Sequence, residues 1–553
     1  MSFATAQDAF FADFFRLYPV FATDAGNHEH DDRWGDLSDA GAAERMAWLA
    51  RARSDLEAAD GLSREEEIDR RVLLGVIDEL RFDEEELDEL SWSPITYSYL
   101  LGGGLFSLLS REFASLDQRL ASAAGRMEGI PAALDAARDN LTSGRGRAVS
   151  GFHVEKAIVT MPGVADLCRT AVEMAAEADP TVRHRVSAAA EPAIAAVDAF
   201  TAWLRDDLLS TATGDFRLGR DLYERKFAHR LKATMSPEDL EARAEASYEQ
   251  VRAEMLRLAR ELWPAWIGDE PMPDDENVLT RRVLDAIAVD HPPADELLDY
   301  CRAEHGRIEA FIRERDLIGL ADEPLQIIWT PPFLRAFGGA MLIPPGPLDK
   351  GLDSFFAITP PPEDWSDEQV ESMLRENNGR SLRVLTIHEA VPGHYLQLAW
   401  SNRCTSLARA VFGSGVFAEG WAVYVTQVMM DVGYGADDPA LMLAHWKYFL
   451  RACTNTLMDI RIHTGSMSED EAMKLMVEGG FQEESEAREK WSRARLSSTQ
   501  LCEYYLGSVE MTELERESRR RSGDDFAWRP FLESVISHGT PPMPVIRDIL
   551  FGD

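Results

Sequence analysis

Apolar residues recur at intervals of three and four along most of this chain, the spacing typical of helices with one buried face. The clearest stretch follows Ser236, which can cap a helix N-terminus, and Pro237, which suits the first helical position. Pro264 interrupts the pattern, so the sequence predicts a helix over residues 236–263. Its apolar stripe consists of Leu240, Ala244, Tyr248, Val251, Met255, Leu258 and Leu262.

The same periodicity predicts helices through most of the remaining sequence. From Asp367 onward the pattern is helical almost to the C-terminus. The expected fold class is therefore mainly α, a large multi-helix scaffold. The other predicted helices cover residues 10–18, 43–59, 65–90, 123–141, 165–178, 188–209 and 294–315.

Two short segments break the helical pattern and predict a small β-sheet. Residues 324–329 and 354–359 are rich in aromatic and β-branched side chains and are bounded by prolines, which favours strands. Gly338, Gly339 and residues 344–347 lie between them and are typical of turns. We therefore expect a mainly helical part over residues 1–320. A part over 321–553 would hold the sheet, and the two would form one continuous structural unit.

Charge and apolar content exclude several classes of protein. The chain has 553 residues, of which 57 are basic and 96 acidic, and its formal net charge of −39 would repel nucleic acid. No run of 18 apolar residues occurs, so no membrane span is expected. Residues 1–8 have neither a basic region nor an apolar core, which favours a cytoplasmic location.

The five cysteines are far apart and never form a Cys-x-x-Cys pair. This spacing argues against a disulfide framework and against a zinc site made of thiolates. Any metal chemistry must therefore come from histidine and carboxylate side chains.

The strongest chemical signal is the stretch His388-Glu389-Ala390-Val391-Pro392-Gly393-His394, followed 25 residues later by Glu419. Two imidazoles, an adjacent carboxylate and a later carboxylate are what a hydrolytic zinc site needs. However, histidines six apart do not share a face of an unbroken helix, unlike the usual spacing of four. Proline and glycine between them predict a break that could return His394 to the side of His388.

This stretch, together with Glu419-Gly420-Trp421-Ala422-Val423-Tyr424, resembles the bacterial family named domain of unknown function 885. That family is similar to helical gluzincin metallopeptidases. The resemblance extends to residues 18–26, 459–465 and 500–507 and thus covers nearly the whole chain. It implies a gluzincin-like scaffold with the sheet beside the active-site helix. It also implies one Zn²⁺ per chain on His388, His394 and Glu419, with Glu389 as general base.

Hydrolysis of this kind also needs donors for the oxyanion that forms when water attacks. In the gluzincin relatives a tyrosine and a histidine serve that end, and here Tyr504, Tyr505 and His463 are the candidates. Gly507 follows closely, which favours Tyr505 slightly, although packing of one tyrosine in a core is the alternative. Arg461 could bind a substrate carboxylate as a bidentate fork, or pair with one of the many acids.

Substrate could also contact the predicted sheet. The strand containing Phe356 could pair with an extended peptide if it lay at a sheet edge. Gly338 and Gly339 would permit close approach of a substrate backbone. A buried strand and an ordinary turn are the alternatives.

These observations predict a zinc-dependent hydrolase that acts on short peptides as a monomer or homodimer. A metal-dependent amidase or esterase with a small non-peptide substrate is the first alternative. A non-catalytic helical binding protein with a degenerate site is the second. Neither a nucleic-acid partner nor a membrane partner is expected.

Overall fold

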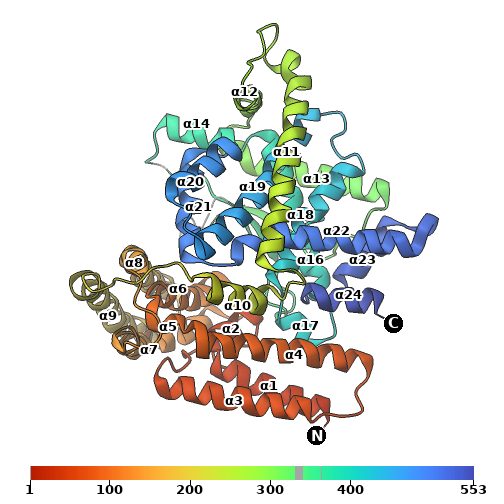
Figure 1. The fold of residues 1–553 in the computed structure, drawn as a ribbon. Helices are drawn as coiled ribbons and strands as arrows, with labels where there is room; N and C mark the ends of the chain where they lie inside the picture. The colour runs from red at the N-terminus through yellow and green to blue at the C-terminus, as the bar shows by residue number, and fades with distance from the viewer. Residues whose placement is uncertain (1, 331–339, 363, 553) are drawn as a thin grey trace. The chain divides into compact units, whose positions relative to one another are not determined.

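The amphipathic stripe after Ser236 forms α11 (Pro237–Trp266). The Ser236 hydroxyl accepts the N–H of Asp239 as predicted, and Leu240, Ala244 and Met255 are completely buried. Pro264 lies in the last turn, and the helix ends two residues later than this proline. In Figure 1, α11 runs along α19 (Pro439–Thr464), against which it packs.

The structure is a computed structural model and describes residues 2–330, 340–362 and 364–552. It is mainly α with one small sheet, which confirms the predicted fold class. Within the described ranges, no helix has the length and apolar character needed to cross a membrane.

The chain divides into two compact units, one formed by Met1–Leu218 with Pro345–Leu352 and the other by Gly219–Pro344 with Asp353–Asp553. The division therefore falls after residue 218, about a hundred residues before residue 320, where the predicted mainly helical part ends. Helices lie on both sides of residue 218, so hydrophobic periodicity carries no signal for this boundary.

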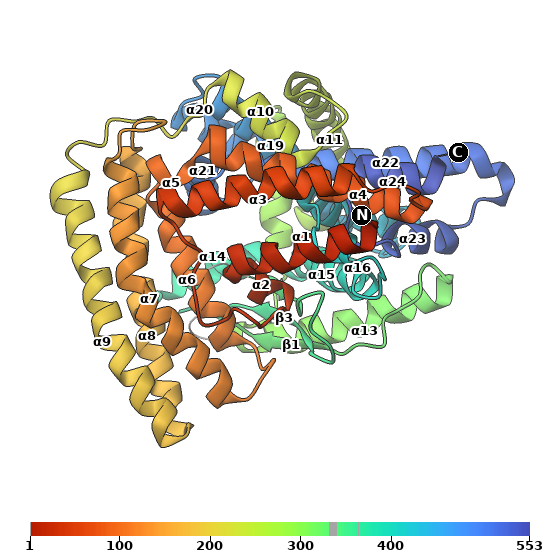
Figure 2. The ribbon, with the colours of Figure 1, turned by 90° about the horizontal axis from the view of Figure 1, so that it is seen from below.

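The first unit consists of helices, among which α7, α8 and α9 lie side by side (Figure 2). Its helices are α1 (Phe3–Leu17), α2 (Pro19–Ala25), α3 (Asp39–Glu57), α4 (Arg64–Phe82), α5 (Glu89–Trp92), α6 (Ile95–Ser110), α7 (Leu116–Thr142), α8 (Gly151–Met174) and α9 (Pro180–Trp203).

The second unit contains the sheet and the remaining helices. Besides α11 and α19, these are α10 (Arg220–Leu231), α12 (Glu276–Ala288), α13 (Leu297–Arg315), α14 (Asp367–Glu376), α15 (Gly379–Glu389), α16 (His394–Ser401), α17 (Leu407–Val411), α18 (Gly415–Asp431), α20 (Glu469–Met473), α21 (Glu484–Leu496), α22 (Glu503–Ser522), α23 (Trp528–Ile536) and α24 (Met543–Phe551). Short π or 3-10 turns flank several helices of both units: η1 (Asp83–Leu87), η2 (Ala175–Glu177), η3 (Leu204–Leu208), η4 (Ala294–Glu296), η6 (Lys474–Gly479), η7 (Gln500–Cys502) and η8 (Gly523–Asp525).

The sheet has three strands in the order β1-β3-β2. Both predicted strands are confirmed as β1 (Leu325–Trp329) and β3 (Ser354–Ile358), which pair in parallel. Strand β2 (Ala340–Ile343), which pairs antiparallel with β3, was not predicted, because four residues beside turn-forming segments show little alternation of apolar and polar side chains.

The sheet packs beside the helix that carries His388. Side chains of β1 and β3, including Ile327 and Phe356, share a buried core with Leu382 and Ala390 of the α15 region. The predicted position of the sheet is therefore confirmed. This packing fixes α15 along its buried face, which is what a site at its C-terminal end requires.

Candidate metal centre

His388 lies one residue before the end of α15. Asn378 caps this helix by accepting the N–H groups of Arg380 and Ser381, and Val384 and Ile387 bury its apolar face. The helix stops after Glu389 because Ala390 has φ −99° and ψ −102°, which no helix can continue. The break falls where the sequence predicts it.

Gly393 makes the tight return from α15 to α16 possible. A Cβ atom at this position would lie 1.9 Å from the carbonyl oxygen of His388, so only glycine fits. Its N–H donates to the carbonyl oxygen of Ile387 at 3.0 Å, and α16 then begins at His394. The imidazole rings of His388 and His394 consequently lie 4.7 Å apart, nearly perpendicular to each other.

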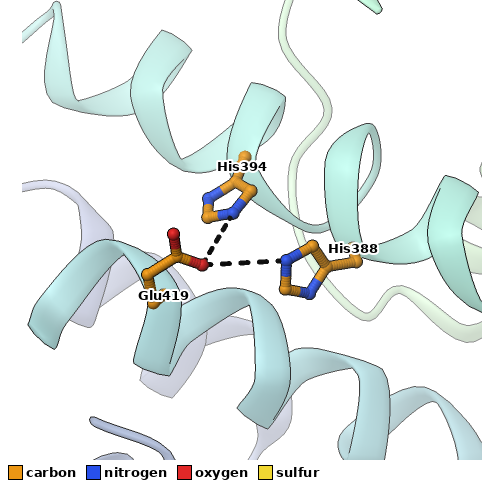
Figure 3. Close-up of side chains that lie close together, drawn as sticks. All are labelled: His388, His394 and Glu419. Carbon is orange, nitrogen blue, oxygen red and sulfur yellow. Dashed lines mark ion pairs between the residues drawn. The ribbon is translucent and has the colours of Figure 1, made fainter. Parts of the chain in front are cut away.

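A third helix supplies Glu419 and also holds the turn. Trp421 of α18 donates its indole N–H to the carbonyl oxygen of Pro392 at 2.9 Å. Two residues earlier on the same helix, Glu419 faces both histidines (Figure 3). One element therefore positions the carboxylate and the loop that aims the second imidazole.

The three side chains fit a single metal ion. Glu419 Oε2 lies 3.3 Å from His394 Nε2 and 3.8 Å from His388 Nε2, and one ligand atom of each residue lies within 4.8 Å of the others. Two atoms ~2.1 Å from an ion in tetrahedral geometry are ~3.4 Å apart. Outside this cluster, buried Glu419 Oε2 has no hydrogen-bond partner within the described part of the chain, as expected of a metal ligand.

The electrostatics of the cluster also favour a cation. Burial, with His394 nearby, lowers the pKa of His388 to about 3, so this imidazole is neutral and can bind a metal. Burial opposes protonation of His394, but Glu419 and Glu389 outweigh it and raise the pKa of His394. Burial likewise opposes ionisation of Glu419, yet the two histidines and Arg493 lower its pKa. Positive charge is thus stabilised between the three side chains.

Glu389 and His388 open into one cavity of about 350 Å³. Burial, assisted by Glu419, raises the pKa of Glu389 to about 7, which places it in the range of a general base at neutral pH. The side chains of His388, His394 and Glu419 are 17, 13 and 22% exposed, and the cavity reaches the centre at His388. Ala340 of β2 also lines it, which brings the sheet edge to the site.

The two adjacent tyrosines have opposite placements. Tyr504 lines the cavity, and its hydroxyl accepts N–H groups from Arg493 at 3.3 Å and Gln500 at 3.5 Å. The hydroxyl of Tyr505 instead contacts Ser247 and the carbonyl oxygen of Arg243, and the side chain is buried. The slight preference for Tyr505 is therefore wrong, because successive helical residues point about 100° apart.

His463 and Arg461 are also placed away from the cavity. His463 is buried, and its Nε2 lies 3.0 Å from the carbonyl oxygen of Ala494 and 2.9 Å from that of Ser497. Arg461 forms ion pairs with Glu241 and Glu245 of α11. The suggested role of His463 as an oxyanion donor is therefore wrong, and this histidine is structural. The suggested role of Arg461 as a fork for a substrate carboxylate is also wrong, because the side chain is paired with two glutamates of the protein.

The suggested substrate contacts of the sheet have different outcomes. Phe356 is completely buried in the core, and its strand β3 lies between β1 and β2 with both edges paired. It therefore cannot add a peptide strand, and that prediction is wrong. Gly338 and Gly339 lie outside the described residues.

Sequence reasoning missed the other walls of the cavity, which α19 and α21 provide. His445 of α19 lines the cavity with Tyr448 and Asn455 of the same helix. A sequence signal was available: His445, Tyr448 and Asn455 follow each other at spacings of three and seven, so these polar side chains share one face of a mostly apolar helix. Lys490 and Arg493 of α21 complete this side, and they carried no recognisable motif.

The fold and the site define a class of mainly helical proteins. In this class two histidines and a glutamate, each from a different helix, lie close enough together to bind one metal ion. The chain belongs to the family described as "Bacterial protein of unknown function (DUF885)", whose model matches residues 19–550. No match to a curated protein was found.

Solved structures that are similar to this chain include two described as those of putative lipoproteins. The one from Shewanella oneidensis, of unknown function, is 31% identical with a TM-score of 0.87, and the alignment covers 100% of each chain. The one from Colwellia psychrerythraea is 16% identical with a TM-score of 0.81 over 99% of this chain and 98% of that one, a likeness of fold alone.

Proposed function

We propose that this protein is a zinc-dependent hydrolase that cleaves peptides. The observation that carries the proposal is the convergence of His388, His394 and Glu419 on one point, with His388 and the adjacent Glu389 lining a cavity. Two histidines and a carboxylate, with room for a water molecule, are the donor set of hydrolytic zinc sites. Zinc bound there would lower the pKa of a water molecule and polarise the scissile carbonyl group.

Glu389 acts in this proposal as the general base. Its carboxylate takes a proton from the attacking water and delivers it to the departing nitrogen atom. A pKa of about 7 suits both transfers, because the group gains and loses a proton readily near neutral pH.

Tyr504 is the proposed oxyanion donor. Its oxygen already accepts two N–H groups, so its own proton is available for a substrate oxygen. Burial and the charge of Glu419 raise its pKa, which keeps the hydroxyl protonated.

Metal analysis tests the ligand set. We expect about one zinc per chain after purification with added zinc, and Glu419→Ala should lower the affinity at least tenfold. His463→Gln changes a buried histidine outside the cluster and serves as the control. Equal zinc content in all three proteins would contradict the ligand assignment.

Digestion of a peptide library tests the reaction. Glu389→Gln keeps the shape of the side chain and leaves the three ligands intact, so it should retain zinc and lose roughly 10²–10⁴ of kcat. Equal cleavage by the wild type and this variant would show that Glu389 is not the base. Cleavage confined to non-peptide amides or esters would instead favour that alternative.

The cytoplasmic location is also a proposal. The alternative is a membrane-anchored location, which the description of the similar structures as putative lipoproteins suggests. Fractionation of cells that express the full-length protein separates the two. Recovery in the membrane fraction, released only by detergent, would overturn the cytoplasmic proposal.

A further inference from the structure

Three basic side chains line the wall formed by α19 and α21: Arg451, Lys490 and Arg493. They stand out because the chain carries 96 acidic residues and a formal net charge of −39. Among the described residues that line this cavity, Glu389 is the single carboxylate.

Arg451 is already neutralised by the protein. Its Nη2 lies 2.9 Å from Glu376 Oε1 and 2.9 Å from Glu486 Oε2. Such a doubly paired guanidinium holds α14, α19 and α21 together and has little capacity left for a ligand.

Lys490 and Arg493 have no such partner. They are three residues apart on α21 and so share one face of the helix. Arg493 Nη2 donates to two uncharged groups, Gln500 Oε1 at 2.7 Å and the Tyr504 hydroxyl at 3.3 Å. Within the described ranges, Lys490 makes no hydrogen bond or ion pair, although both bases interact electrostatically with Glu419.

Neither side chain of this pair forms an ion pair within the described residues, which favours an anionic ligand, although Glu419 and Glu486 partly offset the charge of Lys490. Burial and the nearby charges of Arg451 and Arg493 lower the pKa of Lys490 to about 8. A bound carboxylate would relieve this repulsion and accept charge-assisted hydrogen bonds from both side chains.

Part of the cavity wall is suited to an apolar side chain. Val384 and Leu385 of α15, Val423 of α18 and Phe449 of α19 line it. A volume of about 350 Å³ is at the small end of ligand pockets, so it fits a short ligand.

We propose that Lys490 and Arg493 bind the free C-terminal carboxylate of a short peptide, so that cleavage occurs near its C-terminus. This inference rests on the proposed hydrolase function. In the reaction the water oxygen forms a bond to the peptide carbonyl carbon and the C–N bond breaks. The nitrogen leaves as an amine with a proton delivered by Glu389, and the part released carries the carboxylate held by α21.

Binding without turnover tests the carboxylate contact by itself. The zinc-loaded Glu389→Gln protein is titrated calorimetrically with Leu-Ala-Leu and with its C-terminal amide. We expect the free acid to bind at least tenfold more tightly, because its carboxylate accepts charge-assisted hydrogen bonds, which are stronger than those to a neutral amide.

Variants of the basic pair identify the residues responsible. Adding Lys490→Met or Arg493→Met should reduce the preference for the acid to less than about threefold, whereas Lys490→Arg should keep it. Lys474→Met, which removes a lysine from a different cavity, is the control. Circular dichroism confirms that each variant is folded. Equal binding of acid and amide, no binding of either at millimolar concentration, or an unchanged preference in Lys490→Met would overturn the proposal.

Turnover by the wild type distinguishes this inference from the proposed function. Preferential binding of the acid without any cleavage contradicts the hydrolase and leaves the carboxylate contact standing. Cleavage of acid and amide at equal kcat/KM contradicts the carboxylate contact and leaves the hydrolase standing.

Discussion

Trp421 connects the two halves of the candidate centre through one hydrogen bond. Its indole N–H reaches the carbonyl oxygen of Pro392, in the turn that aims His394, while Glu419 lies two residues before it. The bond is buried, so removing its donor leaves a carbonyl group that water cannot reach easily. The position of His394 therefore depends on a side chain that binds neither metal nor substrate.

Replacing Trp421 with phenylalanine removes this donor and keeps an aromatic ring. We expect the free energy of unfolding to fall by about 1–3 kcal/mol and zinc affinity to fall about tenfold. Trp446→Phe is the matched control, since the indole nitrogen of Trp446 has no partner in the described part of the chain. Urea unfolding and zinc titration measure both effects. An unchanged zinc affinity in Trp421→Phe would show that the turn positions His394 without the hydrogen bond from Trp421.

At the scale of the secondary-structure elements, the close contact of α18 with α22 positions Glu419. The two helices approach through glycines: a Cβ on Gly420 would lie 2.3 Å from the Cα of Gly507, and a Cβ on Gly507 would lie 2.0 Å from the carbonyl oxygen of Val416. Backbone atoms cannot move aside as a flexible side chain can. The distance between the helices, and with it the depth of Glu419, is set by this contact.

Gly420→Ala should therefore push α18 away from α22. We expect a loss of about 1–3 kcal/mol in stability, typical of an overpacked core, and weaker zinc binding because Glu419 moves with the helix. Gly306→Ala is the control: it lies within α13 with no atom within 4 Å of the added Cβ. That variant should gain ~0.5–1 kcal/mol from reduced backbone entropy. Equal stability of the two variants, measured by urea unfolding, would contradict the tight contact.

At the scale of the whole molecule, the connection between the neighbouring strands β2 and β3 leaves the second unit and forms part of the first. Segment Pro345–Leu352 belongs to the first unit, while β2 before it and β3 after it belong to the second. Within the first unit, His28 holds this segment: Nε2 lies 3.1 Å from Asp349 Oδ1, and Nδ1 lies 2.9 Å from Asp31 Oδ2. The ring also stacks on Phe113 with centroids 3.7 Å apart.

This pairing predicts a stability that depends on pH. Burial opposes protonation of His28, but Asp31 and Asp349 outweigh it and raise its pKa to about 9. The charged form therefore stabilises the folded unit fully below the unfolded pKa of about 6.5. That contribution is lost as pH rises through about 9, and it amounts to about 3 kcal/mol at most.

His28→Gln provides the measurement. Urea midpoints of the wild type and the variant should differ most near pH 6 and converge as pH approaches 9.5. Other groups that titrate in this range affect both proteins alike and cancel in the difference. A difference that stays constant from pH 6 to 9.5 would show that the charge of His28 contributes nothing.

The sequence by itself determined the helical class, the two longer strands of the sheet and the four residues of the central motif. Hydrophobic periodicity is local, so α11 could be predicted to within a few residues. The break between His388 and His394 followed equally from local chemistry, because proline removes an intrahelical hydrogen bond and glycine allows dihedral angles outside the helical range.

Only the tertiary structure decided which side chains share the cavity. Tyr504 rather than Tyr505 lines it, and His445, Lys490 and Arg493 join it from helices that are separate in sequence. The central place of β3 in the sheet was equally hidden, since pairing depends on contacts between distant segments. Local patterns specify the faces of elements, whereas the positions at which those faces meet are specified by packing.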